Sequence, residues 1–561
     1  MHAANVILAC STVVKADIWS ELNRTVHGRL HAAAPFSLPC FSTYSGVANT
    51  ADPVACADIQ SHYTSSDFRA QFYNGFMNNQ DEICVSNSTD QCILNNANPL
   101  DAAAFNNRTC SQGSVSRYYI DIQSVEDVQA AYNFSQKTGI KLSIKNSGHD
   151  YLGRSSLQGS LAIWTRNLRG IRRDKEFIPT GCKDIEPIDT ISTAAGVNSD
   201  ETYKFADAEN VTFIGGYATT VGVSGGWAQG GGHSVLSPVY GLGIDRTVQF
   251  QIVTPDRHLR TANVCQNPDL FWALKGGGGG TFGVVLEVTH RVDPVVPLAV
   301  AYIRYTPTAG NIATWLRILV ENGLPWAQQG WGGHLVSSNL ISVTPLLNLS
   351  EAELAMAPAA DFARANNGSV VIEMLPSWYA FYTKYIISNQ VPVAGARILG
   401  TRLLSTVLFA TAEGRQKVVD FLNYLVSIGM SPYIPADSPF LFPWRCNSTS
   451  ATAAWRSSLW EVGFGVNLGW NSTGSQRRTA IQTLQDLDAR ARELTPDGGG
   501  AYMNEASPWT QNWRQDWWGD ENYAALLSIK KRYDPLGLLR CWKCVGFEEG
   551  DDGFECYAGL G

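Results

Sequence analysis

The spacing of apolar residues predicts a dense series of short elements between residues 112 and 294. Apolar and polar positions alternate in some segments, as in strands, whereas Val125, Val128, Ala131 and Tyr132 recur at helical spacing. The predicted elements are strands at residues 118–122, 141–145, 161–165 and 190–196, and helices at 124–137 and 200–209. Mixed helices and strands of this length predict an α+β domain over residues 112–294.

The pattern changes after residue 295. A long helix is predicted at 413–430, and LWEVGFGVNLGW at 459–470 alternates strictly, which is typical of a half-buried strand. These elements predict a second α+β domain over residues 295–500, which ends in the linker-like stretch TPDGGG.

Two further segments complete the predicted organisation. Residues 1–111 are rich in Asn, Ser and Cys and lack periodicity, so we expect a loop-rich extension that packs on the following domain. Residues 501–561 are predicted as a C-terminal segment, with an amphipathic helix at 522–535 that Pro535 ends.

Length, charge and hydropathy exclude several classes of protein. A chain of 561 residues is too long for one core, which agrees with the division above. The formal net charge of −8 argues against a nucleic-acid partner. No apolar stretch approaches the length of a membrane span, so we expect no membrane partner.

Cysteines and glycosylation sequons indicate the compartment. The chain has 12 cysteines, and Cys541 and Cys544 form a C-x-x-C without a second pair to complete a zinc site, so disulfides are favoured. Nine N-x-Ser/Thr sequons predict a glycoprotein of the secretory pathway, either extracellular or vesicular, although the first 16 residues are a poor signal peptide. The sequon asparagines are Asn23, Asn87, Asn107, Asn133, Asn210, Asn348, Asn367, Asn447 and Asn471.

Glycine is concentrated in two runs. Residues 215–245 contain ten glycines in 31 positions, and residues 271–288 contain a second run, FWALKGGGGGTFGVV. Because glycine loses more backbone entropy on folding than any other residue, such runs indicate backbone N–H groups brought close to a large, anionic partner. Neither run matches a Rossmann or Walker A motif, and purely structural loops are the alternative.

The stretch KNSGHDYLGRSS, residues 145–156, places His149 in a polar, glycine-containing loop. The imidazole could be a surface group, a metal ligand, a general base or a covalent anchor, but no partner stands at metal-ligand spacing. Asp150 and Arg154 either order this loop through charge-assisted hydrogen bonds or form a solvated surface pair.

These motifs together resemble one known family. GHDYLGRS, GVSGGWAQGGGHS, DLFWALKGGGGGTFGVV and NYAALLSIKKRYDP are similar to landmarks of the vanillyl-alcohol-oxidase-type flavoproteins, in the berberine-bridge-enzyme-like branch, and especially to its fungal isoamyl-alcohol-oxidase-like members. The resemblance implies a two-part FAD-binding domain of the PCMH type, formed by the N- and C-terminal segments, with an inserted substrate domain whose antiparallel sheet is covered by helices. It also implies FAD as the cofactor.

The resemblance assigns His149 as the residue that attaches covalently to the flavin 8α-methyl group. Many relatives carry a second tether, a cysteine in G-x-C-P-T-V-G, and this chain has Ala218 in the cysteine's place. We therefore expect monocovalent FAD. The other cofactor-binding residues implied are Asn146, Ser147, Gly148, Asp150, Gly153, Ser155, Ala218, Val221, Gly222, Gly225, Gly226, Gly230, Gly231, Gly232, His233, Gly243, Asp245, Asn522 and Tyr523.

The catalytic acid or base is less evident. In LWEVGFGVNLGW the polar position that relatives use falls at Gly463, and alternation places Glu461 on the same face. AYMNEASPW supplies Tyr502 and Glu505, and Glu521 is a further candidate. Four tryptophans nearby form either ordinary core or a substrate-cavity wall, namely Trp509, Trp513, Trp517 and Trp518.

The expected function is FAD-dependent oxidation of a small or medium-sized apolar metabolite, an alcohol or an activated C–H, in fungal secondary metabolism. Hydride passes to flavin N5, and O2 is the electron acceptor. One alternative is a redox-neutral isomerase or cyclase in which Glu505 or Glu521 is a general acid. Another is a flavin-bearing secreted binding glycoprotein with little turnover. We expect a monomer without a metal ion.

Overall fold

The computed structural model describes residues 18–86, 91–496 and 498–560, and its first sheet joins strands from both sides of residue 112. β1 adds a strand from the N-terminal extension, antiparallel to β4, whereas β4, β6 and β5 are parallel. The sheet order is β1 (Leu30–Ala32), β4 (Tyr118–Asp121), β6 (Leu161–Trp164) and β5 (Leu142–Lys145). The extension is thus part of the sheet, a contact that its aperiodic sequence does not predict.

Helix α4 (Val125–Thr138) connects β4 to β5 and begins as predicted. Ser124 and Asp127 form a capping box, and Gly139 ends the helix in the left-handed region. The rest of the extension contains β2 (Thr43–Tyr44), β3 (Val47–Ala48), α2 (Pro53–His62), α3 (Ser66–Arg69) and the 3₁₀ turns η1 (Leu38–Cys40), η2 (Asn79–Asp81) and η3 (Ala102–Ala104).

A five-stranded antiparallel sheet follows, in the order β11-β10-β12-β8-β7. Its strands are β7 (Ile171–Phe177), β8 (Ile188–Ala194), β10 (Thr247–Val253), β11 (Leu259–Ala262) and β12 (Val284–Arg291). Between β8 and β12 lie α5 (Ser199–Ala208), β9 (Val211–Thr212), α6 (Gly226–Gly230), α7 (Ser237–Tyr240), α8 (Gly243–Arg246) and α9 (Pro268–Leu274). The first glycine run spans α6, α7, the start of α8 and the loops between them, and the second lies in the loop between α9 and β12.

The next part of the chain forms a seven-stranded antiparallel sheet, in the order β17-β14-β16-β15-β19-β20-β18. After β13 (Asp293–Pro294), its strands are β14 (Leu298–Arg304), β15 (Gly332–Val336), β16 (Asn339–Thr344), β17 (Ser369–Leu375), β18 (Ala396–Ser405), β19 (Tyr433–Pro435) and β20 (Ser458–Leu468). The α+β class is confirmed.

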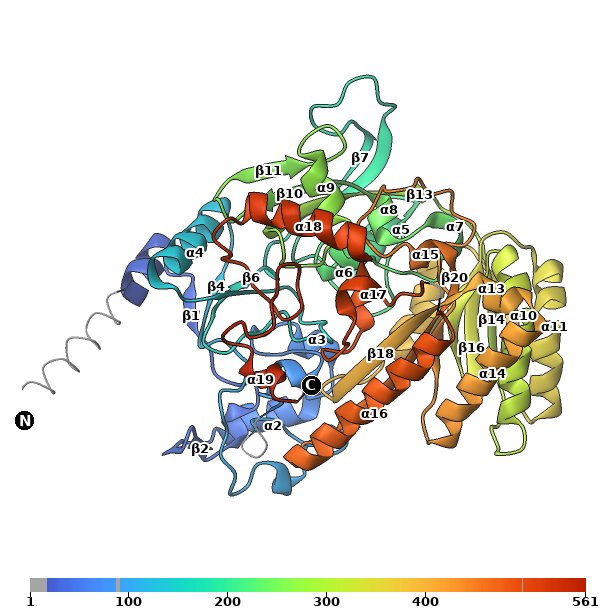
Figure 1. Ribbon diagram of the computed structural model, residues 1–561, viewed down its shortest axis with the longest axis horizontal. Coiled ribbons are helices and arrows are strands. Elements are labelled where there is room, and N and C mark those ends of the chain that lie inside the picture. Colours follow the sequence, from blue (N-terminus) through green and yellow to red (C-terminus); the bar gives the residue numbers. More distant parts are fainter. Residues whose placement is uncertain (1–17, 87–90, 497, 561) are drawn as a thin grey trace, which may run out of the picture.

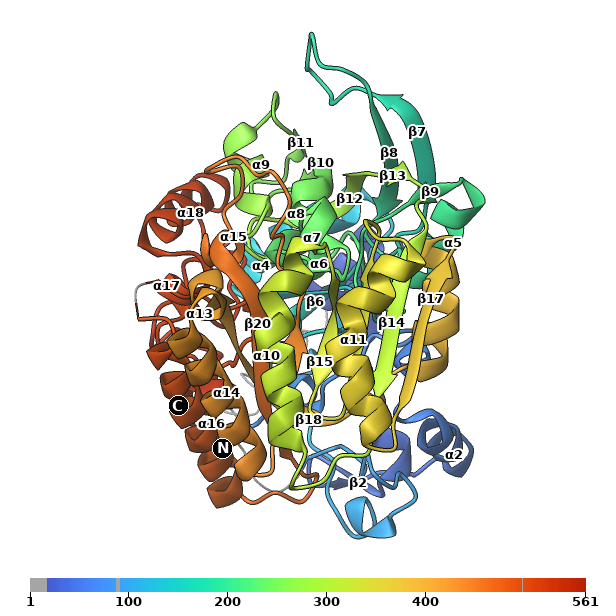
Figure 2. The ribbon, with the colours of Figure 1, turned by 90° about the vertical axis from the view of Figure 1, so that its right-hand side faces the viewer.

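Helices cover one face of the seven-stranded sheet (Figures 1 and 2). The part of the chain between residues 112 and 294, here called the glycine-rich unit, lies against the other face. The covering helices are α10 (Ile312–Gln328), α11 (Leu349–Ala365), α13 (Thr406–Ala410), α14 (Ala412–Ser427) and α16 (Gly474–Glu493). β20 is consequently buried from Ser458 to Phe464 on both faces, so the prediction of a half-buried strand is wrong. The alternating side chains of β20 therefore point to two buried faces of different chemistry, one against the helices and one against the glycine-rich unit, and neither face is exposed to solvent over this stretch.

Shorter elements connect these parts: α12 (Trp378–Phe381), the π-helical turn η4 (Tyr382–Ile386), η5 (Ile387–Asn389) and α15 (Ala454–Ser457). The stretch predicted as a linker, residues 495–500, is packed against the sheet. Leu403 N donates to the Gly500 carbonyl, and Arg402 Nε donates to the Thr495 hydroxyl. Residue 497 lies outside the described part.

The C-terminal segment returns to the glycine-rich unit. It contains η6 (Met503–Glu505), α17 (Trp513–Trp517), α18 (Asp520–Tyr533) and α19 (Glu555–Ala558). Lys530 Nζ donates to the Thr281 carbonyl, and Trp518 Nε1 donates to the Gly276 carbonyl. The domain boundaries at residues 111, 294 and 500 remain predictions.

The cysteine prediction is confirmed, because five disulfides join ten of the twelve cysteines. They are Cys40–Cys56, Cys84–Cys556, Cys92–Cys110, Cys182–Cys265 and Cys541–Cys544. The C-x-x-C is therefore a disulfide. Of the sequon asparagines, the eight within the described residues are all exposed, and Asn87 lies outside them, as does the poor signal peptide.

The four C-terminal tryptophans belong to the hydrophobic core. Each is at most 3% exposed, and the rings of Trp513, Trp517 and Trp518 contact one another. Of the two alternatives for these residues, the structure supports core packing.

Candidate active site

Asp150 organises the loop that carries His149. Its carboxylate accepts hydrogen bonds from the backbone N–H groups of Leu152, Gly153, Arg154 and Ser155, at 2.6 to 3.1 Å, and from the Ser155 hydroxyl at 2.8 Å. Arg154 does not pair with Asp150, because its guanidinium donates to the carbonyls of Trp542 and Lys543. The loop is thus ordered by Asp150, whereas Arg154 ties it to the C-terminal segment.

His149 is held by one side chain. A hydrogen bond of 2.7 Å joins its Nε2 to the Thr220 hydroxyl. The ring is accessible at the surface, yet the surrounding protein desolvates it enough to lower its pKa to about 4, and the charge of Lys145 acts in the same direction. His149 therefore presents a neutral imidazole, with Nδ1 not hydrogen-bonded in the described structure.

Lys145 lies directly beneath this loop. A Cβ added at Gly148 would stand 2.9 Å from Lys145 Cε, so glycine is required there, and its φ of +88° also favours glycine. Lys145 is buried, donates to the Phe72 carbonyl at 3.2 Å and lies 4.7 Å from the centre of the Phe76 ring. Burial lowers the pKa of Lys145 to about 7.

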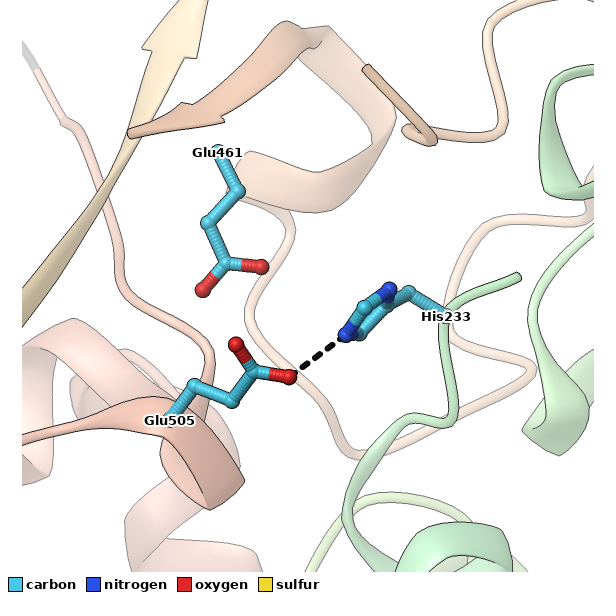
Figure 3. A group of neighbouring side chains, drawn as sticks. All are labelled: His233, Glu461 and Glu505. Atoms are coloured by element: carbon cyan, nitrogen blue, oxygen red, sulfur yellow. Dashed lines mark hydrogen bonds and ion pairs between the residues drawn. The ribbon is translucent and has the colours of Figure 1, made fainter. Parts of the chain in front are cut away.

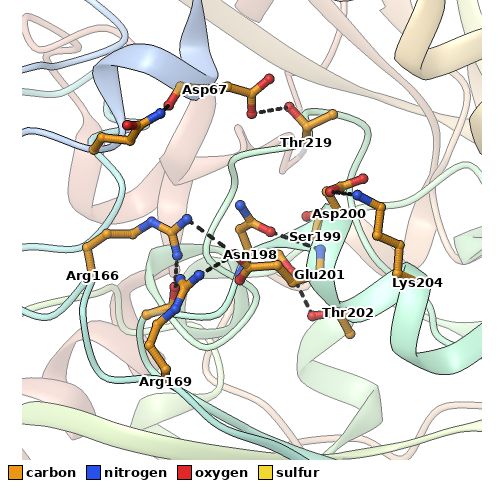
Figure 4. A network of polar contacts seen from close by, with 12 residues as sticks. Asp67, Arg166, Arg169, Asn198, Ser199, Asp200, Glu201, Thr202, Lys204 and Thr219 are labelled. Carbon is orange, nitrogen blue, oxygen red and sulfur yellow. Dashed lines mark hydrogen bonds and ion pairs between the residues drawn. The ribbon is translucent and has the colours of Figure 1, made fainter.

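The segment that carries Thr220 is held from two sides (Figure 4). The Thr219 hydroxyl contacts Asp67 of α3 at 3.4 Å, while Ser199 N and Asp200 N at the start of α5 donate to the carbonyls of Val221 and Thr219. Asn198 and Glu201 form the capping box that begins α5, and Arg169 pairs with Glu201. Thr220 is fixed in position opposite His149 as a result.

The two glycine runs lie against each other. Gly276 N and Gly278 N both donate to the Gln229 carbonyl, at 3.1 and 2.9 Å. A Cβ at Gly279 would stand 3.0 Å from the Gly226 Cα, so side chains would separate the runs. Gly225 is buried, but Gly226 is exposed and faces open space, since a Cβ there would meet nothing within 4 Å.

Two buried polar atoms beside these runs have no partner in the described structure, Asn146 Oδ1 and Gln229 Oε1. Asn146 packs against Gly222, where a Cβ would stand 2.3 Å from Asn146 Oδ1. Orphaned buried polar atoms, glycine backbone and an accessible neutral imidazole fit a large polar cofactor. Of the predicted cofactor residues, those in this region are Asn146, Ser147, Gly148, His149, Ala218, Val221, Gly222, Gly225, Gly226, Gly230, Gly231 and Gly232.

Other predicted cofactor residues have contacts of a different kind. Asp245 forms a buried bidentate ion pair with Arg456, at 2.7 Å for both oxygens, and so links the glycine-rich unit to the segment before β20. Asn522 donates to the carbonyls of Ser450 and Ala451, and the Tyr523 hydroxyl accepts from Gly546 N. A Cβ at Gly243 would meet the Trp227 ring at 2.5 Å.

A second imidazole, His233, lies between two carboxylates. Its Nε2 bonds Glu505 Oε1 at 2.6 Å (Figure 3). Its Nδ1 pairs with Asp437, which is fully buried. Burial opposes the charge of His233, but Asp437 and Glu505 more than offset it and raise its pKa well above the usual value. His233 is therefore an imidazolium in this ion-paired cluster, and its predicted contact with the cofactor stays a prediction.

Glu461 completes the cluster. Ligand atoms of His233, Glu461 and Glu505 all lie within 4.8 Å of one another. Glu461 faces the cluster because it lies on β20 in register with Leu403, on the same sheet face as Gly463. It is 0% exposed, and burial followed by the Glu505 charge raises its pKa well above the usual value.

Tyr502 also joins this site. Its hydroxyl accepts from Gly232 N at 3.1 Å and from the Asn504 amide at 2.8 Å, and its ring lies edge-on to His233 at 5.2 Å. Glu521, in contrast, is exposed in the first turn of α18 and is not part of the cluster.

Four residues of the site were not predicted: Thr220, His334, Tyr433 and Asp437. Tyr433 stacks on His334 at 5.3 Å, and both lie on the sheet face that carries Glu461. Asp437 follows β19 in the Pro-rich stretch IPADSPF, where no periodicity marks it. Thr220 could have been found as a hydroxyl within the glycine block, two residues after Ala218.

Comparison with known proteins agrees with this geometry. The family described as "FAD binding domain" matches residues 116–263, and the family "Berberine and berberine like" matches residues 501–543. The FAD-linked oxidoreductase cheF of Chaetomium globosum is 43% identical over 96% of this chain and 88% of its own length. The chain belongs to the FAD-linked oxidoreductases.

Two further relatives are similar to this chain over nearly their whole length. The FAD-linked oxidoreductase OXR2 of Pyricularia oryzae is 41% identical, over 96% of this chain and 94% of that protein. The VAO-type flavoprotein MtVAO615 from Myceliophthora thermophila C1 superposes with a TM-score of 0.81, at 26% identity, and covers 96% of both chains. The predicted family, the VAO-type fold and the enzymatic class are confirmed.

A more distant structure informs on the fold. The glucooligosaccharide oxidase of Acremonium strictum, whose FAD is described as 6-S-cysteinyl and 8α-N1-histidyl, has a TM-score of 0.62 at 19% identity. The likeness covers 77% of this chain and 92% of that one.

No helix among the described residues of the present chain is long and apolar enough to cross a membrane.

Proposed function

We propose that the protein is an oxidase whose FAD is attached by a single bond, through His149. The observation that carries this proposal is the accessible, desolvated imidazole of His149, held by Thr220 beside the glycine runs. A neutral imidazole nitrogen is the form that can act as a nucleophile. The 8α-histidyl bond of the glucooligosaccharide oxidase is a precedent for such attachment on this fold.

A second tether has no candidate nucleophile at the corresponding position. Ala218 lies two residues before Thr220 and carries no reactive group. Cys182 and Cys265, the nearest cysteines in sequence, are joined to each other. Within the described residues the remaining thiol, Cys446, is exposed.

The proposed reaction is oxidation of an alcohol or an activated C–H. When bound, FAD accepts a hydride at N5 and returns the electrons to O2. Glu505 accepts the proton that the substrate loses, since its carboxylate is partly exposed and is oriented by His233. Asp437 holds the imidazolium of His233, which in turn stabilises the negative charge of Glu505.

The sheet face beside Glu505 supports an apolar substrate. Gly463 and Gly465 lie on the same face of β20 as Glu461, and their partners on β18 are Thr401 and Leu399. Tyr433 pairs with Gly463, so an aromatic ring borders this side-chain-free strip. We propose that the substrate is a small or medium-sized apolar metabolite of secondary metabolism.

One alternative is favoured by a specific observation. Glu461 and Glu505 place two carboxyl groups in one buried cluster, which suits delivery of a proton to the substrate as well as its removal. In a redox-neutral isomerase or cyclase, Glu505 would act as general acid.

The deciding experiment is a metabolite panel in which H2O2 and product mass are measured together. Oxidation predicts H2O2 and loss of two hydrogen atoms, with bleaching of the flavin under anaerobic conditions. A product of unchanged mass without bleaching would replace the oxidase proposal by the isomerase, and no product at all would favour a binding protein.

We also propose that the enzyme is a glycoprotein of the secretory pathway. The five disulfides and the eight exposed sequon asparagines support this location. Protein from the native host, treated with an N-glycosidase, should show a mass decrease and deamidation at these asparagines. Unmodified peptides at all eight sites would refute the proposal.

A further inference from the structure

The cluster around Glu505 contains more negative charge than its neighbours balance. Three carboxyl groups, those of Asp437, Glu461 and Glu505, converge on one imidazole. They come from separate parts of the chain: the end of β19, strand β20 and the turn η6. Because His233 carries at most one positive charge, full ionisation would leave two net negative charges here.

Glu461 is the member that lacks compensation. Both of its carboxyl oxygens are buried and have no hydrogen-bond acceptor or donor partner in the described structure. Asp437 and Glu505, by comparison, each bond one nitrogen of His233. A buried carboxylate without partners is costly, and the usual result is that the group takes up a proton.

The groups that face Glu461 are the carboxylates of Glu505 and Asp437, the imidazolium of His233, the phenol of Tyr433 and the hydroxyl of Thr401 on β18. The Thr401 hydroxyl and the Glu505 carboxylate are both placed to accept the Glu461 proton, and the carboxylate is the stronger acceptor. His233 has both nitrogens occupied, and Asp437 lies on its far side. Figure 3 shows the Glu461 carboxyl group directed toward Glu505.

We propose that Glu461 is a neutral carboxylic acid that shares its proton with the Glu505 carboxylate. The Glu461 carboxyl group, which lies within 4.8 Å of Glu505 without bonding it in the structure, turns to donate its O–H to one Glu505 oxygen, while His233 holds the other. The pair then carries one proton and one negative charge, and Glu461 is a positioning residue that keeps Glu505 ionised and oriented. When a substrate takes up a proton at this site, the shared proton passes from Glu461 to Glu505 and on to the substrate, and both carboxyl groups are then ionised.

The claim that the Glu461 proton takes part in catalysis rests on the proposed function, whereas the claim that Glu461 is protonated does not. Infrared spectroscopy of the holoenzyme near neutral pH detects the C=O stretch of a protonated carboxyl separately from carboxylate bands. Asp81 is also buried with a raised pKa, so the contribution of Glu461 is obtained as the difference between wild type and Glu461→Gln. Glu353→Gln, an exposed site on α11, is the matched control.

The expected result is a protonated-carboxyl band, sensitive to H/D exchange, that Glu461→Gln removes and Glu353→Gln retains. If Glu461→Gln does not fold, Glu505→Gln supplies the second test, because an amide is a weaker acceptor and should move the Glu461 band to higher frequency. A difference spectrum without this band, or a stoichiometric divalent metal bound by ionised Glu461 and Glu505, would overturn the proposal. Failure of the oxidase proposal appears separately, as colourless denatured protein or absence of H2O2.

Discussion

His149 and His233 lie on two loops of the same glycine-rich unit, and the surrounding protein desolvates both rings although His149 is exposed and His233 is half-buried. His149 has one neutral partner, the Thr220 hydroxyl, and desolvation, with the charge of Lys145 acting in the same direction, lowers its pKa to about 4. His233 has two carboxylates, which raise its pKa despite the desolvation. Desolvation acts in the same direction at both sites, so the charged neighbours of His233 decide that one imidazole is neutral and the other is charged.

The difference separates two chemical tasks. A neutral nitrogen at His149 is suited to bond formation with the flavin, whereas an imidazolium at His233 is suited to hold Glu505 in its ionised form. Exchanging these states would disable both sites. The following predictions test this assignment, from the largest effect to the smallest.

Replacing His149 should have the largest effect. His149→Ala removes the only proposed attachment, so all flavin should leave the protein on denaturation, whereas wild-type protein stays yellow and fluorescent in a denaturing gel. Cys446→Ser is the control and should keep the colour, since this thiol is exposed. Retained flavin in His149→Ala would mean that another residue is the anchor.

Removing the charge of Glu505 tests the second site. Glu505→Gln should lower kcat by about 10²- to 10⁴-fold, the usual contribution of a general acid or base. Flavin attachment should be unchanged, because His149 is held by Thr220. Turnover is measured with the substrate that the panel identifies, and Glu353→Gln should match wild type. A loss of turnover below tenfold would remove Glu505 from the proton-transfer step.

A third imidazole, His290 on β12, is buried with no hydrogen-bond partner on either ring nitrogen among the described residues. It is 1% exposed, and desolvation, with the charge of Arg246 acting in the same direction, lowers its pKa to about 3. Because the folded-state pKa lies below the unfolded value, the unfolded chain binds the proton first as the pH falls. Stability is therefore lost between about pH 6.5 and about pH 3, by roughly 3 kcal/mol at about pH 4.

His290→Phe should abolish this part of the acid sensitivity. The measurement is the urea midpoint at about pH 7 and about pH 4, and the variant should lose less stability between them by roughly 3 kcal/mol. An equal loss in both proteins would show that His290 becomes protonated within the folded state.

The smallest effect is expected at Thr220. Thr220→Val removes one hydrogen bond to His149, worth about 1 kcal/mol, so covalent flavin incorporation should slow by about fivefold. Thr220→Ser keeps the hydroxyl and should retain the wild-type rate. The time course of acid-stable flavin fluorescence measures both. Identical rates in all three proteins would make Thr220 irrelevant to the orientation of His149.

The sequence predicts the first of the two sites better than the second. His149, Asp150 and the glycine runs are contiguous motifs, so their chemistry is visible locally. Periodicity predicts β4, α4, β5, β6, β8 and α5, but it does not predict β7, β10, β11 or β12. The pairing of β1 with β4 is not visible, because three residues in an aperiodic segment give no pattern.

The cluster around His233 could be predicted only in part. Glu461, Tyr502 and Glu505 were candidates, but their meeting with His233 depends on a sheet register and on the return of the C-terminal segment. Asp437, which completes the charge balance, lies in a loop without periodicity. The motif predicts that His233, which follows three glycines, contacts the cofactor; its two carboxylate partners add a role that no local pattern indicates, and the cofactor contact stays a prediction.

The bond between Cys84 and Cys556 has a consequence for biosynthesis. It joins residues 472 positions apart, and the segment after residue 500 also supplies Lys530 to Thr281 and Trp518 to Gly276. The loops beside the glycine runs thus gain their final contacts only after the ribosome has made nearly the whole chain. The proposed flavin attachment is then a late event that follows translation, and a chain cut after residue 500 should lack the yellow colour of attached flavin.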